Sequence, residues 1–364
     1  MRYVSLNYNY SPDFTTSQSW LDRVKAYNGI LTSLARQHEV ISIKQIGYNG
    51  VCLHEGVEHH FTDFEKKTWF PVRLNKFISD LQPDIVVVQG LHKPLQVVLL
   101  RLLLNKKVKI IAHHHAERPF TGIKKYAQRL ADKFINAYLF ASRDMGLDWV
   151  KRGNLASAQK IHEVMEVSSV FYPVDKNVAL SKTNASGNLV FLWVGRLNEN
   201  KDPLTVLKAF LRYIDHEPSA RLYMIYHTDE LLPQINHLLS GHRNKNSVKL
   251  IGRVPNSELL YWYNSADFIL SGSHYEGSGT AVCEAMSCGC IPVITDIFSF
   301  RMITDNGQCG FLYEPGNEDA LLAVLLNTPQ LNRQQKRAKC LEYFRSNLSF
   351  DAIARRIDQI VASL

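Results

Sequence analysis

Two cations in the second half of the chain have neighbours that suit the binding of a diphosphate. Arg196 and Lys201 follow the apolar run LVFLWVG, which is typical of a buried parallel strand, and lie next to Asp202 and Pro203. Asp and Pro are favoured at the first positions of a helix, so we expect both cations between a strand end and a helix start. Cations and a helix N-terminus together attract an anion. The segment therefore indicates a diphosphate site, with two ordinary surface cations as the alternative.

Two carboxylates stand in the stretch SHYEGSGTAVCEAMSCGCIPVIT, residues 273–295. The pattern predicts a glycine turn that contains Glu276, a helix that contains Glu284 and ends near Gly289, and then the strand IPVIT. If residues 276–284 were all helical, the two carboxylates would lie roughly 12 Å apart along the axis. Carboxylate pairs that hydrolyse glycosides lie about 5–9.5 Å apart. We therefore interpret them as two groups that hold hydroxyls of one polyol ligand, with a surface position for Glu284 as the alternative.

Histidines gather at the end of another predicted strand, VKIIAHHH, as His113, His114 and His115. Neighbouring residues of an extended strand point to opposite faces, so at most His113 and His115 share a face. No third ligand at a suitable spacing is evident, and we therefore expect one histidine to act on a substrate rather than a metal site. A second group, at positions 54, 59 and 60, is interpreted as a polar surface segment.

Several common catalytic patterns are absent from the sequence. No GxGxxG follows a predicted strand, and the chain contains no P-loop, no GxSxG and no DxD pair that would hold a metal–diphosphate. The six cysteines form no CxxC pair, which argues against a structural zinc or redox site. The N-terminus does not resemble a signal peptide, and the apolar run 96–104 is far shorter than a membrane span. We therefore expect a cytoplasmic protein with reduced cysteines.

The net charge of +8 lies in one half of the chain. Residues 1–180 hold 24 Lys and Arg against 16 Asp and Glu, whereas residues 181–364 hold 18 of each. This excess indicates an anionic partner for the first half, such as a lipid phosphate or an acidic membrane surface, with a solvated basic face as the alternative. No base-stacking aromatic module accompanies the charge, so we expect no nucleic-acid partner.

The elements that must position these residues alternate between strands and helices. Strands are predicted at RYVSLNYNY, HEVISIKQI, DIVVVQG, VKIIAHHH and AYLFAS, with helices near 19–37, 70–81, 96–104 and 123–132. A polar, turn-rich stretch at 171–188 precedes a second series: LVFLWVG, RLYMIYH, SVKLIG, DFILSGS and IPVIT, with helices near 203–213, 230–239, 257–264 and 280–286. A last helix is predicted in FDAIARRIDQIVASL. The alternation predicts an α/β fold with two doubly wound parallel sheets.

These motifs together resemble the retaining, GT-B-fold glycosyltransferases of family 4, within the glycosyl transferases group 1. The likeness rests on GRLNENKDP, GRVPNSELLYWYNSAD, EGSGTAVCE followed by AMSCGCIPVI, and NGQCGFLYEPGNEDAL, and in the first half on HEVISI, DIVVVQG and KIIAHHHAE. It implies two Rossmann-like domains that face each other across a cleft. Their expected bounds are 1–172 for an acceptor-side domain, 173–188 for a linker, 189–346 for a nucleotide-sugar domain, and 347–364 for a C-terminal helix that packs back toward the first domain.

The resemblance also implies roles for individual residues. Arg196 and Lys201 would neutralise the donor diphosphate in place of a metal, so neither a metal nor another cofactor is expected. Glu276 would bind donor-sugar hydroxyls and Glu284 ribose hydroxyls. His115 would contact the donor sugar and its reacting centre, with His114 as the other register. The remaining donor-binding positions would be Gly277, Ser278, Gly279 and Thr280 through their backbone amides, and Arg253 and Val254 beside the base.

The activity implied is transfer of a sugar, with retention, from a nucleoside diphosphate sugar to an acceptor hydroxyl. We expect UDP rather than GDP, and an acceptor glycan or glycolipid of cell-surface polysaccharide or glycolipid synthesis, with possible peripheral contact to the inner face of an anionic membrane. A nucleotide-sugar epimerase and a non-catalytic sugar-nucleotide-binding protein are the alternatives. The chain departs from the family after the first strand, where YSPDFTTSQSW lacks the usual glycine pair, and at Ser278, where a bulkier residue is common.

Overall fold

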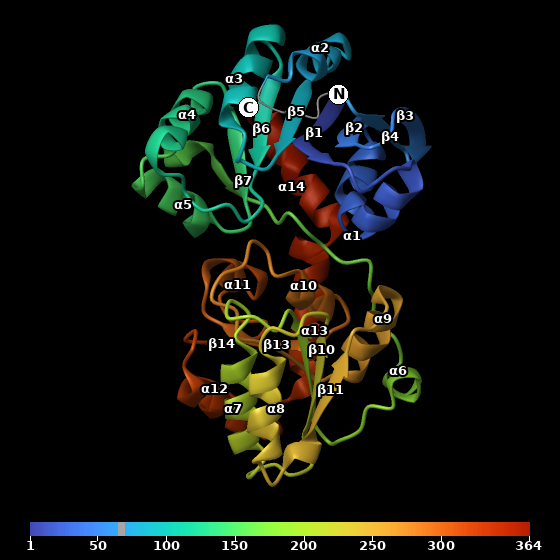
Figure 1. Ribbon diagram of the computed structural model, residues 1–364, viewed down its shortest axis with the longest axis vertical. Coiled ribbons are helices and arrows are strands. Elements are labelled where there is room, and N and C mark those ends of the chain that lie inside the picture. Colours follow the sequence, from blue (N-terminus) through green and yellow to red (C-terminus); the bar gives the residue numbers. More distant parts are fainter. Residues whose placement is uncertain (65–69) are drawn as a thin grey trace. The chain divides into compact units, whose positions relative to one another are not determined.

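The computed structural model describes residues 1–64 and 70–364, except for the side chains of residues 25–27. The chain forms two compact units, each built on its own sheet (Figure 1). Unit 1 comprises Met1–Ser168 together with Phe350–Leu364, and unit 2 comprises Ser169–Ser349.

The sheet of unit 1 has the strand order β3-β4-β2-β1-β5-β6-β7-β8. All neighbouring strands are parallel except β3 and β4, which form an antiparallel hairpin. Its strands are β1 Arg2–Ser11, β2 Glu39–Ile46, β3 Gly50–His54, β4 Val57–Thr62, β5 Ile85–Gln89, β6 Lys109–His113, β7 Ala137–Phe140 and β8 Ile161–Glu163. The order reverses at β1, whose neighbours are β2 and β5, and the carboxyl ends of strands at such a reversal are where doubly wound sheets bind ligands.

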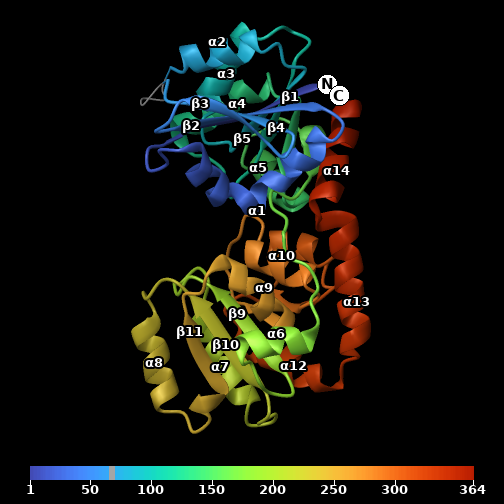
Figure 2. The ribbon, with the colours of Figure 1, turned by 90° about the vertical axis from the view of Figure 1, so that its right-hand side faces the viewer.

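Helices cover both faces of this sheet (Figure 2). On one face, α1 (Ser17–Ala35) packs against α14 (Phe350–Ala362); on the other, α2 (Val72–Asp80), α3 (Pro94–Leu103) and α4 (Gly122–Asp132) lie side by side. Helix α5 (Arg143–Lys151) and a 3₁₀ turn at Ala158–Lys160 complete the unit. Among the described residues, no helix combines the length and the apolar character that crossing a membrane requires.

The C-terminal helix α14 belongs to unit 1 although unit 2 precedes it in the chain. Its apolar stripe, which includes Ile353 and Ile357, is buried, as its helical spacing predicts. Asp358 accepts a hydrogen bond of 2.7 Å from the hydroxyl of Tyr3 on β1, and Asp351 pairs with Arg36 beyond the end of α1. The helix therefore closes the face of the sheet that α1 leaves open.

The prediction of a polar surface segment holds for His54, which is exposed, but is wrong for His59. These residues form the hairpin of β3 and β4, and His59 is only 1% exposed. Its ring lies nearly parallel to that of Phe61, and burial lowers its pKa to about 4. Phe61 lies two residues away on β4, whereas the Asn28 amide, 3.5 Å from His59 Nε2, belongs to α1, so composition alone could not reveal this burial.

Unit 2 contains a fully parallel sheet with the order β11-β10-β9-β12-β13-β14. The strands are β9 Val190–Gly195, β10 Arg221–Tyr226, β11 Val248–Gly252, β12 Phe268–Ser271, β13 Ile291–Thr295 and β14 Phe311–Tyr313. The helices are α6 Lys176–Thr183, α7 Pro203–Tyr213, α8 Leu232–Ser240, α9 Asn256–Ser265, α10 Thr280–Ser287, α11 Phe298–Ile303, α12 Glu318–Asn327 and α13 Arg333–Tyr343, which runs into a π-helical turn at Phe344–Leu348. The order reverses at the neighbours β9 and β12, which places two long loops together at the carboxyl edge.

The stretch expected to be a linker contains helix α6. Asp175 caps its N-terminus by accepting from the backbone N–H groups of residues 177 and 178, and Asn184 ends it at a φ of +54°. The helix packs against α9, where the Thr183 and Ser265 hydroxyls lie 2.8 Å apart. Only Ala179 of this helix is buried, so its sequence lacks the apolar periodicity by which a helix is recognised.

Candidate functional site

At the carboxyl edge of the unit 2 sheet, the loops after β9 and β12 bring Lys201 and Glu276 into an ion pair. Lys201 Nζ contacts Glu276 Oε1, and the Ser273 hydroxyl donates to the same oxygen at 2.6 Å. Both charged side chains remain partly accessible, at 28% for Lys201 and 15% for Glu276. A cation and a carboxylate at one accessible place can hold a ligand that carries both an anionic group and hydroxyls.

The two loops are held together by their backbones. The N–H of His274 donates to the carbonyl of Asn200 at 2.8 Å, and the Asn200 amide donates to the carbonyl of Tyr275 at 3.0 Å. Gly272 permits this approach, because a Cβ there would lie 2.6 Å from the carbonyl oxygen of Asp202. Asp202 in turn caps α7 by accepting from the N–H of Thr205. The position of Lys201 is therefore fixed by backbone contacts on both sides.

Helix α10 begins beside Glu276 at Gly279, which has a φ of +71°. The N-cap residue is this glycine, which has no side chain with which to cap the helix. A Cβ at position 279 would lie 2.5 Å from the ring of Phe300, so the turn requires glycine both for its φ and for its space. Gly277 is not among the residues with positive φ. The first N–H groups of α10 are thus presented next to the Lys201–Glu276 pair.

Glu284 is 7% exposed, so the alternative of a helix-surface residue is wrong. Its Oε2 accepts a hydrogen bond of 2.8 Å from the buried hydroxyl of Tyr263 on α9. Burial raises the pKa of Glu284 to about 7, and the Tyr263 hydroxyl opposes this shift. Near neutral pH the carboxyl group can therefore exist in both protonation states.

The other residues expected around a donor lie at the same edge of the sheet. Arg196 follows β9 and Arg253 follows β11, and both are exposed. Val254 is partly buried and packs against the hydrophobic core under α9. Because all strands of this sheet are parallel, the residues that follow them share one edge. Within this set, the side chains of Lys201 and Glu276 are in direct contact.

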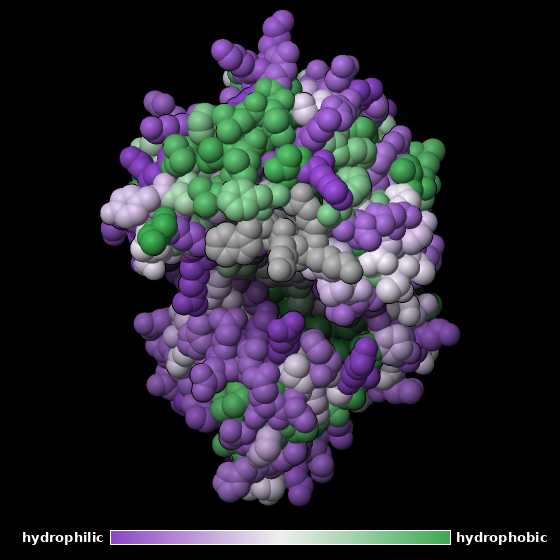
Figure 3. Space-filling model, turned by 45° about the horizontal axis from the view of Figure 1, so that its top comes forward, coloured by the Kyte–Doolittle hydropathy of each residue, from purple (hydrophilic) through white to green (hydrophobic). Residues whose placement is uncertain are grey.

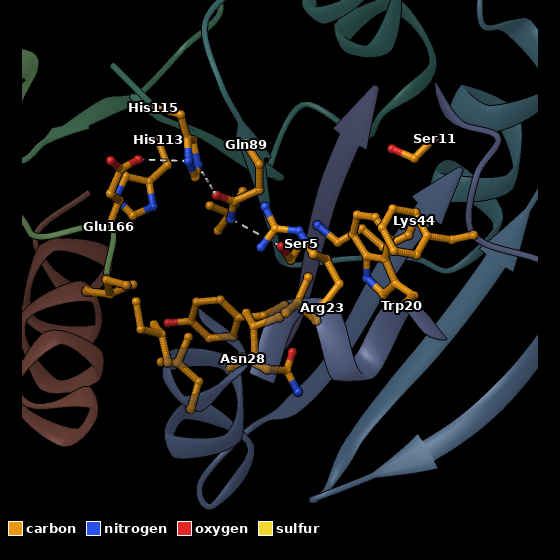
Figure 4. Close-up of a pocket in the computed structure, with 18 residues that line it drawn as sticks. Ser5, Ser11, Trp20, Arg23, Asn28, Lys44, Gln89, His113, His115 and Glu166 are labelled. Carbon is orange, nitrogen blue, oxygen red and sulfur yellow. Dashed lines mark hydrogen bonds and ion pairs between the residues drawn. The ribbon is translucent and has the colours of Figure 1, made fainter. Parts of the chain in front are cut away.

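Unit 1 has a cavity of about 420 Å³ at the carboxyl ends of its central strands. Figure 4 shows two ends: His113, His115 and Glu166 at one, and Ser5, Arg23, Trp20 and Lys44 toward the other, with Gln89 between them. The cavity extends along α1 and is lined in addition by Ser11 and Phe14, which belong to the stretch where the sequence departs from its family, and by apolar residues of α1.

His115 at one end of this cavity is held by two side chains. Its Nδ1 lies 2.8 Å from Glu166 Oε2, and its Nε2 lies 2.7 Å from Gln89 Oε1. The Gln89 amide group donates in turn to Ser5 on β1 at 3.2 Å. The ring is 41% exposed, so it is both oriented and accessible to a ligand.

The neighbouring histidines have different surroundings. His113 lies on the same side as His115, with ring centroids 5.3 Å apart, as strand alternation predicts. Its Nε2 is buried without a hydrogen-bond partner among the described residues, and burial lowers its pKa to about 3. His114 is 1% exposed and stacks on Phe140 inside unit 1, so it does not reach the cavity surface. In the described part of the chain, no three His, Cys, Asp or Glu residues are grouped so that they could hold a metal.

Sequence reasoning missed the basic end of the cavity. Lys44 Nζ lies 5.9 Å from the centre of the Trp20 ring, and burial lowers the pKa of Lys44 to about 8. A lysine within the apolar strand HEVISIKQI was a signal that could have been recognised, because a buried lysine usually has a partner or a function. Arg23 and Trp20 give no such signal, since both belong to a surface-facing stretch of a long helix.

The second half of the chain is similar in sequence to known proteins. Residues 176–346 match the family model described as glycosyl transferases group 1, a little under half of the chain. The O-antigen chain mannosyltransferase B of Escherichia coli is 28% identical over 144 residues, which are 38% of this chain and 36% of the relative. The alpha-monoglucosyldiacylglycerol synthase of Streptococcus pneumoniae is 27% identical over 185 residues, 49% of this chain and 40% of the relative. The matched segments thus span well under half of these curated relatives.

Solved structures match the whole chain by fold. A glycosyltransferase from Rickettsia africae has a TM-score of 0.74 at 16% identity and covers 100% of this chain and 97% of that one. HepE from Anabaena, solved in complex with UDP, has a TM-score of 0.73 at 14% identity and covers 100% of both chains. The predicted α/β fold with two parallel sheets, of the GT-B class, is confirmed.

Proposed function

We propose that this chain, whose residues 176–346 carry the domain of the glycosyl transferases group 1, is a glycosyltransferase enzyme of class EC 2.4. It moves a sugar from a nucleoside diphosphate sugar to an acceptor hydroxyl. The observation that carries the proposal is the Lys201–Glu276 ion pair beside the start of α10, within the matched domain.

On the donor side, Lys201 and Arg196 stabilise the diphosphate as it leaves, together with the first N–H groups of α10. Negative charge grows on the leaving diphosphate as the glycosidic bond opens, so fixed cations there stabilise the transition state more than the ground state. These cations take the place of a metal ion, and no other cofactor is required. A bound diphosphate competes with Glu276 for Lys201. This competition frees the Glu276 carboxylate to accept hydrogen bonds from hydroxyls of the donor sugar.

The remaining donor contacts follow from the positions of the side chains. Glu284 lies about one helical turn into α10. When it is ionised, its carboxylate accepts hydrogen bonds from the ribose hydroxyls. Arg253 and Val254 lie beside the base, and the backbone amides of residues 277–280 meet the sugar and the phosphate. UDP is the proposed carrier, which is supported by the complexes of HepE from Anabaena with UDP and UDP-glucose.

Retention of the anomeric configuration is proposed with attack from the face of the leaving group. Glu276 Oε1 is engaged by both Lys201 and Ser273, and Glu284 is buried against Tyr263, so neither carboxylate is poised as a covalent nucleophile. The proposed assignment to family 4 rests on the sequence motifs described above, such as GRLNENKDP and EGSGTAVCE.

On the acceptor side, we place the ligand in the cavity of unit 1. His115 contacts the reacting groups, and Glu166 and Gln89 orient its ring. Lys44 and Arg23 at the other end suit an anionic group of the acceptor, beside the Trp20 ring. Names of the relatives, an O-antigen mannosyltransferase and a glycolipid synthase, support an acceptor from polysaccharide or glycolipid synthesis. The proposed location is cytoplasmic and peripheral at the inner face of a membrane.

The test is a screen of nucleotide sugars by thermal shift, followed by product analysis with lipid-linked and glycan acceptors. A ligand at about 100 times its Kd adds ~2.7 kcal/mol of stability, which the melting curve resolves. Lys201→Ala should lower transfer by about 10²–10³-fold, the usual cost of removing one transition-state contact. Lys208→Ala, at an exposed lysine of α7, should leave transfer unchanged.

Three outcomes would contradict the proposal. Full turnover by Lys201→Ala would remove the role of the ion pair. Release of free nucleoside diphosphate without any need for an acceptor would favour an epimerase. Nucleotide-sugar binding without turnover across the acceptor panel would favour a non-catalytic binding protein.

A further inference from the structure

Helix α4 has its apolar residues on the outside. Ile123, Tyr126 and Leu130, spaced i, i+3 and i+7, are 89%, 73% and 42% exposed. The buried side of the same helix carries Ala131 and the polar residues Gln128 and Asp132. A helix on the surface of a globular protein normally has its apolar side chains facing the core and its polar side chains facing solvent. The outer stripe of α4 therefore needs an explanation other than packing within unit 1.

The neighbouring helix α3 extends this apolar surface. Its inner side is buried, and its outer side exposes Leu95, Leu102 and Leu103 at 47%, 72% and 45%. Helices α3 and α4 pack against each other, and α2 packs on the far side of α3 with Val72 exposed at 60%. Figure 3 shows apolar side chains gathered over this part of unit 1, with hydrophilic ones at the margins. Exposed apolar surface of this extent is typical of an interaction site.

The charges around this surface are positive. Residues 93–133 contain ten Lys and Arg against two acidic residues, an excess of eight that equals the net charge of the chain. The two acids do not face outward: Glu117 accepts the N–H of Leu91, and Asp132 is buried and accepts the N–H of Ala156. Exposed cations flank the apolar residues at positions 106, 107, 118, 124, 129 and 133.

We propose that the outer face of α3 and α4, which we call the α3–α4 face, binds the surface of an anionic lipid bilayer. Leu95, Leu102, Leu103, Ile123 and Leu130 enter the boundary between headgroups and acyl chains, and Tyr126 lies at the headgroup level, as aromatic residues with a polar end do. Flexible lysines extend from the same face to lipid phosphates, each contributing about 1 kcal/mol near an anionic surface.

A lipid surface fits these observations better than a protein partner. Apolar and cationic side chains are interspersed over two helices, and the exposed positive charge has no exposed acid beside it in residues 93–133. A second copy of this chain would bring a positive face against an identical positive face, which is unfavourable. The inference does not depend on sugar transfer, so vesicle binding and enzymatic activity can be tested separately.

The experiment is sedimentation of the 364-residue chain with vesicles of phosphatidylcholine alone and with equal parts of phosphatidylcholine and phosphatidylglycerol. We expect binding to the anionic vesicles at low salt and a large loss at about 1 M salt, where charges are screened beyond about 3 Å. The variant L102E/I123E should bind about tenfold less or weaker still, because it removes two apolar anchors and adds two negative charges. The variant K106E/K107E should weaken binding and reduce its dependence on salt.

The matched control is Leu53→Glu on strand β3, because Leu53 is 75% exposed and Leu102 is 72% exposed. The control should bind as the wild type does, and all variants should retain the wild-type melting temperature, since their side chains are exposed. Absence of wild-type binding to anionic vesicles at low salt would overturn the proposal, as would an equal loss in Leu53→Glu. A dimer that L102E/I123E dissociates, seen by light scattering, would assign the face to a second copy instead.

Discussion

The buried carboxyl group of Glu284 makes the stability of unit 2 depend on pH in a defined direction. Its pKa is about 7 in the folded protein against 4.5 for an ordinary Glu. Between pH 4.5 and about 7, Glu284 of the folded protein holds a proton that the unfolded chain has released. The proton therefore stabilises the fold at low pH, and this contribution is lost as the pH rises through about 7.

The magnitude follows from the size of the shift. Each pKa unit corresponds to about 1.4 kcal/mol, so a shift from 4.5 to about 7 corresponds to about 3 kcal/mol. Glu284→Gln has the shape of the protonated acid and can still accept from Tyr263. The variant should match the wild type at pH near 4 and exceed its unfolding free energy by about 3 kcal/mol at pH near 8.5.

The assay is urea unfolding of wild type and variant across this pH range, compared at each pH so that other titrating groups cancel. Glu258→Gln, at an exposed position of α9, is the control and should follow the wild type throughout. Parallel curves for Glu284→Gln and the wild type would refute the reasoning, because they would mean that burial does not penalise the charged carboxylate. A nucleotide whose ribose hydroxyls bind the ionised form should bind more tightly as the pH rises through about 7.

Three further outcomes are expected from the packing. Gly279→Ala should destabilise unit 2 by about 1–2 kcal/mol or more in urea unfolding, because its φ is +71°, whereas Gly241→Ala, at a φ of −84°, should be neutral or slightly stabilising; equal effects would contradict the strain. Ile353→Ala on α14, at 1% exposure, should cost about 2–5 kcal/mol and expose unit 1 to proteolysis, and an unchanged digestion pattern would argue against the docking of this helix. Tyr263→Phe should move the pH midpoint of the Glu284 effect upward, since the lost hydroxyl opposed the raised pKa; an unchanged midpoint would exclude the hydrogen bond.

Much of the fold could be predicted because it rests on local patterns. Helix α7 has the predicted bounds, Pro203–Tyr213, since Asp202 and Pro203 mark its start and its apolar residues recur at helical spacing. The central strands of both sheets appear where apolar runs predict them, because strands covered on both faces are apolar throughout. Strands β3, β4, β8 and β14 were not predicted, since they are short or carry polar residues. Helix α6 was missed for the converse reason, since it buries a single residue and has no periodic signal.

Some features of the candidate site could likewise be predicted from the sequence, and others could not. Composition and turns marked Lys201, Glu276 and Glu284 as residues of interest, and alternation on the strand separated His114 from its two neighbours. Composition could not show that Glu284 is buried, because the burial is provided by elements such as α9 that lie apart from it in sequence. It likewise gave no reason to select Ser273, Tyr263, Gln89 or Glu166, each of which contacts a predicted site residue.

The sequence by itself determined the central strands of both sheets and helices such as α7, where the glycine turns lie, and that Lys201 and Glu276 each follow a strand. These features depend on periods of two and 3.6 residues and on the conformations open to Gly, Pro and Asp, all of which act over a few positions. Only the tertiary structure decided that the two side chains meet, 75 residues apart, because β9 and β12 are neighbours in the sheet. It also decided which side of α4 faces outward. Helical periodicity in a sequence shows that apolar residues share one side of a helix, but not whether another part of the protein covers that side.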